Sequence, residues 1–311
     1  MVYVFSRPSA HKRGPVRAIA FCMLILFLTG NSSPVRAELI LSAGAGVTYE
    51  DNIVGLLSGG GIASPPAGAQ QGMQAMQAGT KGFGTGAGSG AAGGKASYIG
   101  AGSQSPGDLS VMVMAELGVS GQSGGSFTFY ALGYAEKIDY QEFSEYDQAA
   151  AGMNAGATVY MSDAFSASLS GSGGTRYYEN DPARDGEEYS GTAGLKQYIT
   201  DNLWLREAAS YNVYRAELQD FSNRGTSCRL AAGYDLTDDL LVTAGYRFQS
   251  RQYQDTAATV LRTRTLLLGG DYDLTDHWSA WLAYERQTTH PGTSDVITRN
   301  NMFTLSLRWD Y

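Results

Sequence analysis

The sequence predicts an all-β protein: a transmembrane antiparallel up-and-down β-barrel of about 12 strands, spanning residues 38–311. Apolar and polar side chains alternate with a period of two, which is typical of strands with one apolar and one wet face. A similar turn sequence also recurs every 37 or 38 residues, which indicates repeated hairpins. No apolar run after residue 37 reaches 18 residues, so a membrane location would require strands.

Residues 1–37 have the features of a secretory signal peptide. A basic start precedes an apolar run of eleven residues, from Ala18 to Leu28, and small residues end at a cleavage site after Ala37. The run is shorter than the roughly 20 residues of a spanning helix, which disfavours an uncleaved anchor. Cleavage would remove five Lys/Arg and no Asp/Glu, leaving 17 basic and 30 acidic residues. A net charge of −13 argues against a nucleic-acid partner.

The first strand is expected from Leu39 to Tyr49, and an acidic segment follows it. Tyr49, Asp51, Asn52 and Ile53 resemble the first strand of the β-barrel porin families of Gram-negative bacteria. The wider resemblance covers the layout of residues 38–311 and implies an outer-membrane location. Some of these families accompany exopolysaccharide or export systems, so the resemblance also implies a small solute or a polysaccharide as a partner.

Residues 54–107 differ in composition from the rest of the chain. Gly, Ala, Ser and Gln dominate, and Lys81 and Lys95 are the only charges. Such a segment buries too little apolar surface to offset its chain entropy, which predicts a long surface loop inserted after the first strand. The segment could instead fold into the barrel as a constriction. Met73 and Met76 could offer soft ligands to copper, but no His or Cys accompanies them, so we predict no metal and no cofactor.

Short turns divide the rest of the chain into hairpins. Each turn has an aspartate after Ser or Thr, at spacings of 38, 37 and 38 residues: Asp163, Asp201, Asp238 and Asp276. Asp, Thr and Gly favour tight turns because they hydrogen-bond locally or accept unusual backbone angles. Longer polar stretches alternate with these turns, at residues 142–147, 180–186, 219–225 and 290–295. Outer-membrane barrels have this arrangement, with the short turns in the periplasm.

The parity of each strand, counted from its turn aspartate, separates lipid-facing from lumen-facing side chains. Even offsets carry large apolar residues such as Leu236 and Tyr246, and Cys228 is a small apolar residue of the same face. Glu207 shares the lipid-facing parity, so either a β-bulge re-aims it or the parity assigned to that strand is wrong. Odd offsets carry small and polar residues together with charges that we predict to line a pore: Lys196, Arg206, Arg229, Arg247, Asp271, Asp273, Glu285 and Arg308.

These charges predict a basic wall, built by four successive strands, beside an acidic wall. The opposite charges could pair and plug the barrel, or they could set a transverse field across a small aqueous lumen. Eight strands leave an interior filled by side chains, and about 16 leave an open channel. Twelve strands lie between these limits, so both interpretations stay open.

The C-terminal strand alternates strictly and ends on an aromatic side chain; its apolar residues are Phe303, Leu305, Leu307, Trp309 and Tyr311. This pattern resembles the closing strand of outer-membrane barrels, which typically ends on an aromatic residue and serves as the assembly signal. The resemblance implies outer-membrane lipid and the barrel assembly machinery as partners.

Two classes of function follow from these predictions. One is a narrow porin-like channel for small solutes. The other is a structural or envelope-assembly barrel, associated with polysaccharide export. An enzyme is not expected, because His277 lies in a short turn, His290 lies in a loop, and no motif places either beside a nucleophile.

Overall fold

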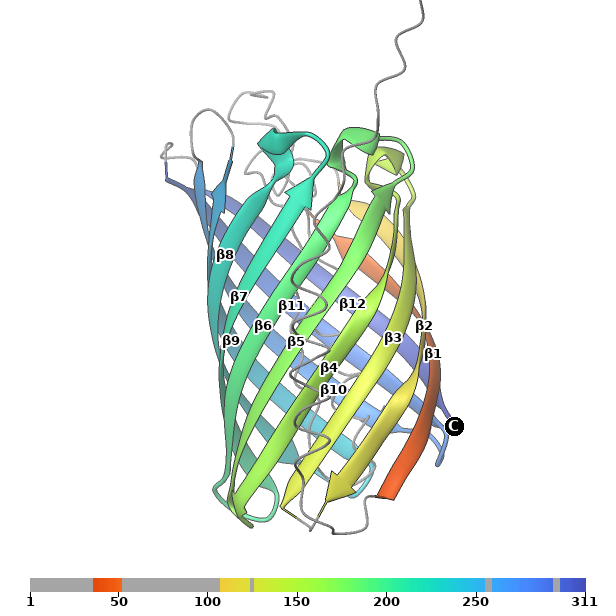
Figure 1. Ribbon diagram of the computed structural model, residues 1–311, viewed down its shortest axis with the longest axis vertical. Helices are drawn as coiled ribbons and strands as arrows, with labels where there is room; N and C mark the ends of the chain where they lie inside the picture. Colours follow the sequence, from red (N-terminus) through yellow and green to blue (C-terminus); the bar gives the residue numbers. More distant parts are fainter. Residues whose placement is uncertain (1–35, 52–106, 124–125, 255–258, 293–296) are drawn as a thin grey trace, which may run out of the picture.

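Twelve strands form one closed antiparallel barrel, in which each strand pairs with its sequence neighbours and the last pairs with the first (Figure 1). The computed structural model describes residues 36–51, 107–123, 126–254, 259–292 and 297–311. The strands are β1 (Arg36–Glu50), β2 (Asp108–Ser123), β3 (Phe127–Tyr140), β4 (Gln148–Ser162), β5 (Phe165–Tyr178), β6 (Gly186–Tyr198), β7 (Leu203–Ala216), β8 (Asn223–Asp235), β9 (Leu240–Tyr253), β10 (Val260–Asp273), β11 (Trp278–Pro291) and β12 (Thr298–Asp310). The predicted fold class and strand number are confirmed.

Two expected segments lie largely outside the described residues. These are residues 1–35 of the expected signal peptide and residues 54–106 of the expected loop, including the two methionines considered as metal ligands. The first strand begins at Arg36, before the expected start at Leu39, and Arg36 already pairs with Gln122 of β2.

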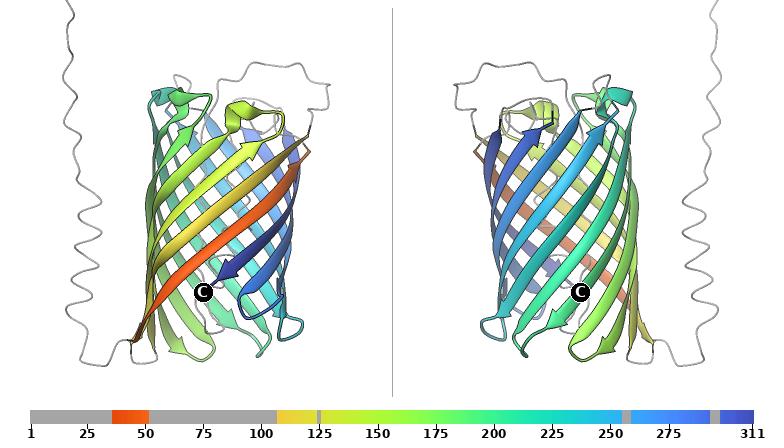
Figure 2. Two further views of the ribbon diagram at one scale, coloured as in Figure 1. Left: turned by 90° about the vertical axis from the view of Figure 1, so that its right-hand side faces the viewer. Right: turned by 90° about the vertical axis from the view of Figure 1, so that its left-hand side faces the viewer.

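The two ends of the barrel differ in their connections (Figure 2). Short turns, the start of β1 and the end of β12 lie at the lower end in that view. The loops at the other end contain three 3₁₀ turns: η1 (Ser144–Tyr146), η2 (Pro182–Arg184) and η3 (Gln219–Phe221). Because short turns of outer-membrane barrels lie in the periplasm, the 3₁₀ loops form the outer mouth.

The threonine of the recurrent turn sequence explains why the turn recurs. Thr200 Oγ1 accepts a hydrogen bond from the backbone N–H of Leu203 at 3.0 Å, and Thr237 Oγ1 accepts one from Asp239 at 3.3 Å. Thr275 Oγ1 accepts hydrogen bonds from the two backbone N–H groups that follow Asp276, at 3.2 and 3.1 Å. A threonine hydroxyl that satisfies these backbone donors favours a tight turn over continuation of the strand.

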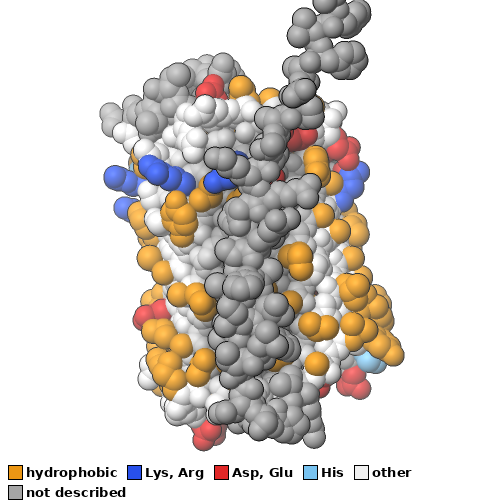
Figure 3. Space-filling model, viewed as in Figure 1, with side chains coloured by type: hydrophobic (Ala, Val, Ile, Leu, Met, Phe, Trp, Pro, Cys, Tyr) orange, Lys and Arg blue, Asp and Glu red, His pale blue; other side chains and the backbone are white. Residues whose placement is uncertain are grey.

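The side chains alternate between an exposed outer face and a buried inner face. Large apolar residues dominate the outer face of β8 to β12 and of β1 and β2, and the side view in Figure 3 shows hydrophobic side chains along the barrel wall. Such a wall matches the apolar band that faces lipid in membrane barrels. Cys228 is exposed on this face, as predicted. None of the described residues belongs to a helix that is long and apolar enough to cross a membrane.

Glu207 lies on the outer face, opposite Leu195 of β6 and Leu230 of β8. The register of β7 with both neighbours is continuous, so no bulge re-aims this carboxylate and the parity assigned to the strand is correct. The register shift in the described strands instead lies on β4, between Tyr160 and Ser162.

The closing seam joins the acidic segment after β1 to β12. Asp51 accepts hydrogen bonds from both the backbone N–H and the side-chain amide of Asn301. At the other end of the seam, the backbone N–H of Tyr311 donates to the carbonyl of Leu41 at 3.0 Å. The seam is therefore held at both ends by contacts additional to the strand ladder.

Candidate functional site

The lumen gathers all eight charged residues that the sequence assigned to pore lining. Each has the inward parity of its strand; Lys196, Asp271, Glu285 and Arg308 are buried, and Arg206, Arg229 and Arg247 are half-buried. Asp273 has the same parity but is exposed, because it lies at the short-turn end of β10.

Four of these residues form what we call the cationic wall: Lys196, Arg206, Arg229 and Arg247, from β6, β7, β8 and β9. Lys196 stands directly opposite Arg206, and Arg229 stands directly opposite Arg247. Like charges in directly opposed positions destabilise a sheet. The cationic wall therefore holds like charges in positions where they repel one another.

Aromatic rings hold the lysine of the cationic wall near the short-turn end. The Lys196 ammonium donates a hydrogen bond to the hydroxyl of Tyr198 at 2.8 Å. It also lies 4.3 Å from the ring centroid of Tyr198 and 4.6 Å from that of Trp204. Cation–π contacts of this kind stabilise a cation.

Carboxylates on the same or a nearby strand approach two of the basic residues. Arg247 lies 3.6 Å from Glu285 of β11, whose side chain is 1% exposed. Arg308 lies 3.9 Å from Glu116 of β2 and 2.7 Å from Asp310. The charges of the lumen are therefore partly paired.

Several inward aromatic rings lie over glycines of the neighbouring strand. A Cβ atom at Gly233 would lie 2.2 Å from the ring of Trp204, and one at Gly269 would lie 2.3 Å from the ring of Trp281. The same contact places the Tyr130 ring over Gly156. These rings occupy the space of absent side chains, so they cover the barrel wall instead of projecting across the lumen.

A second charged cluster lies inside the barrel towards the outer mouth. Arg176 of β5, 2% exposed, lies 3.3 Å from Glu188 of β6 and 3.7 Å from Glu136 of β3. It also donates a hydrogen bond to the side chain of Gln148 at 2.9 Å. Small Ala150 lies between Glu136 and Arg176 in the register, which lets the two long side chains meet.

An apolar layer lies beside this cluster. Its buried members are Met112, Met114, Ile138, Tyr140, Tyr146, Tyr178 and Tyr214. Sequence reasoning missed these residues and Arg176, because the inward face of β3 is apolar near the mouth and the outward face of β3 to β5 is rich in Ala and Gly. In β3 to β5 the usual contrast between a strongly apolar outer face and a polar inner face is therefore absent.

The loops of the outer mouth are tied to one another around one arginine. The Arg184 guanidinium lies 4.8 Å from the ring centroid of Tyr146, 5.9 Å from that of Tyr178 and 5.4 Å from that of Phe221. Its Nε lies 2.7 Å from Asp181. Three loops therefore share one buried cation, which makes the mouth a packed structure.

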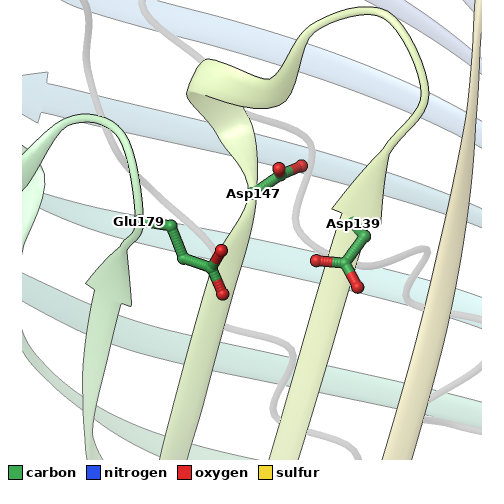
Figure 4. A group of neighbouring side chains, drawn as sticks. All are labelled: Asp139, Asp147 and Glu179. Atoms are coloured by element: carbon green, nitrogen blue, oxygen red, sulfur yellow. The ribbon is translucent and has the colours of Figure 1, made fainter.

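Three carboxylates meet on the outer rim at the ends of β3, β4 and β5: Asp139, Asp147 and Glu179 (Figure 4). The Lys137 ammonium lies 3.0 Å from Asp139 and 3.1 Å from Glu179, and Asp147 accepts the backbone N–H of Tyr140. Burial, together with repulsion from the other two carboxylates, raises the pKa of Asp147 above its ordinary value. We therefore interpret the three carboxylates as a surface ion-pair cluster with Lys137.

No protein-family model and no curated protein matches this sequence. Among solved structures, an outer membrane channel from Pseudomonas putida F1 matches 91% of this chain and 99% of its own, with a TM-score of 0.58 and 11% sequence identity. This chain has the fold of an outer-membrane β-barrel. The outer membrane channel DcaP of Acinetobacter baumannii has a TM-score of 0.41 at 10% identity, over 91% of this chain and 99% of its own. KdgM porin in complex with disordered oligogalacturonate has a TM-score of 0.42 at 12% identity, over 66% and 96%.

Proposed function

We propose that this protein is a narrow channel of the outer membrane for small solutes and that its lumen prefers anions. The observation that carries the proposal is the cationic wall, in which four inward cations stand on successive strands and oppose one another in pairs. Fixed charges of one sign in a narrow pore raise the local concentration of ions of the other sign. Carboxylates such as Glu285 reduce the preference, so we expect it to be modest.

Two features favour a conducting lumen over a plug. The like charges of the cationic wall stand directly opposite one another and lower the folding stability of the barrel, which argues against a purely structural role. The rings of Trp204 and Trp281 lie over glycines of the wall. The Arg176 cluster and the apolar layer narrow the lumen towards the outer mouth, so the proposed solutes are small.

The proposal assigns no catalytic role to the barrel. The histidines at positions 277 and 290 stand at opposite ends of β11. His277 Nδ1 lies 3.0 Å from the carbonyl oxygen of Asp310, in a short turn. A nucleophile needs a base and an orienting group together, and the described residues do not bring these histidines to one site.

Reversal potentials in planar bilayers under a salt gradient test the proposal. Changing Arg229 and Arg247 together to Glu should shift the reversal potential towards cations. A control variant with Arg215 and Arg224 changed to Glu carries the same change in charge on the outer face, and it should shift the potential far less. Equal shifts in both variants would contradict a role for the lumen charges. Absence of any wild-type conductance would favour a structural or assembly barrel, including one beside a polysaccharide exporter.

A further inference from the structure

The outer face carries its cations in a single band. Among the described strand residues, seven exposed Lys and Arg have the outward parity, and these lie in the half of the barrel nearer the outer mouth: Lys137, Arg215, Arg224, Arg262, Arg264, Arg286 and Arg299. A rise of ~3.3 Å per residue, a strand spacing of ~4.8 Å and a tilt of ~40° place them within about 10 Å along the barrel axis. In the view of Figure 3, Lys and Arg side chains lie towards the upper edge of the hydrophobic wall.

The short turns at the opposite end have the opposite charge. The described turns comprise residues 163–164, 199–202, 236–239 and 274–277, and they contain no Lys or Arg. They contain five aspartates: Asp163, Asp201, Asp238, Asp239 and Asp276. Among the described strands, outward-facing cations therefore lie only in the half of the barrel nearer the outer mouth.

Among the described strands, the acids of outward parity lie on one side of the barrel. Lys137 is paired with Asp139 and Glu179, and Arg215 stands directly opposite Glu187. Among the described residues of β8 to β12, by contrast, no Asp or Glu has the outward parity. Five of the seven cations of the band lie on β8 to β12: Arg224, Arg262, Arg264, Arg286 and Arg299.

Four residues of this side form what we call the arginine cluster: Arg262, Arg264, Arg286 and Arg299, from β10, β11 and β12. Arg264 and Arg299 flank the same residue of β11, Thr288, and Arg262 stands opposite His290. Nearer the membrane centre the same strands present large apolar side chains, including Leu266, Leu268, Leu282 and Phe303. A cationic cluster therefore stands directly above a surface suited to acyl chains.

We infer that the arginine cluster binds the phosphate groups of anionic lipid headgroups in the outer leaflet. Guanidinium groups bind phosphate oxygens through paired, charge-assisted hydrogen bonds. Arginines on three adjacent strands can contact one headgroup from several directions, while its acyl chains lie along the apolar wall. This role belongs to the outer face and is independent of the proposed channel.

Binding of diphosphoryl lipid A to the folded barrel in neutral detergent, followed by native mass spectrometry, tests this inference. The variant R262Q/R264Q should bind the lipid about tenfold more weakly than wild type, because two solvent-exposed charge contacts are lost. The matched control K137Q/R215Q loses two cations of the same band that have acidic neighbours, so its binding should stay close to that of wild type. R262K/R264K, which keeps the charge, should bind with intermediate affinity.

Equal loss in R262Q/R264Q and K137Q/R215Q would overturn the inference, because it would show a diffuse charge effect. Equal wild-type binding of lipid A and of neutral phosphatidylcholine would also overturn it. Reversal potentials of the same variants separate this inference from the channel proposal. Lipid binding that depends on the arginine cluster supports the inference whether or not the barrel conducts.

Discussion

Replacing Arg176 by Met should destabilise the barrel strongly, because it leaves two buried carboxylates without their cation. Glu188 and Glu136 lie 3.3 and 3.7 Å from the guanidinium, and all three side chains are less than a tenth exposed. At an effective dielectric constant of ~20, each attraction amounts to about 4–5 kcal/mol before the cost of desolvating the charges. Removal of one partner from such a buried cluster costs about 3–5 kcal/mol in net stability.

Urea unfolding of the barrel refolded in lipid vesicles measures this loss at neutral pH. The triple variant E136Q/R176M/E188Q removes all three charges and is the matched control. It should recover most of the lost stability, because a neutral cluster has no unpaired charge to bury. A cost below about 1 kcal/mol, or a triple variant as unstable as R176M, would refute the reasoning.

Two further outcomes are expected. E285Q removes the carboxylate 3.6 Å from Arg247, so it should shift the reversal potential towards anions. In proportion to the charge changed, this shift should be about a quarter of the opposite shift in R229E/R247E. A shift towards cations would contradict the assignment of the lumen charges. Deleting Tyr311 should reduce the amount of barrel recovered in outer membranes, because its backbone N–H bonds to Leu41 across the closing seam and its ring ends the proposed assembly signal. Tyr311→Phe keeps both features and should be recovered normally, whereas unchanged recovery of the deletion would exclude this role.

The sequence by itself determined the barrel, its twelve strands and the inward parity of eight charges on β6 to β12. In those strands, the face towards lipid carries large apolar residues and the face towards the lumen carries small or polar residues. The period of two can therefore be recognised in the sequence. The recurrent threonine and aspartate then mark each short turn. Glu207 was the exception to this pattern, and the continuous register of β7 shows that neither a bulge nor a wrong parity explains it.

Only the tertiary structure decided which charges meet. Arg176 reaches Glu136 across β4 because Ala150 lies between them, and Arg184 joins three loops at the mouth. The arginine cluster likewise depends on the register that brings β10, β11 and β12 to one height. Alternation is a local property of a single strand, whereas these contacts depend on register and tilt, which are set when all the strands pair and the barrel closes.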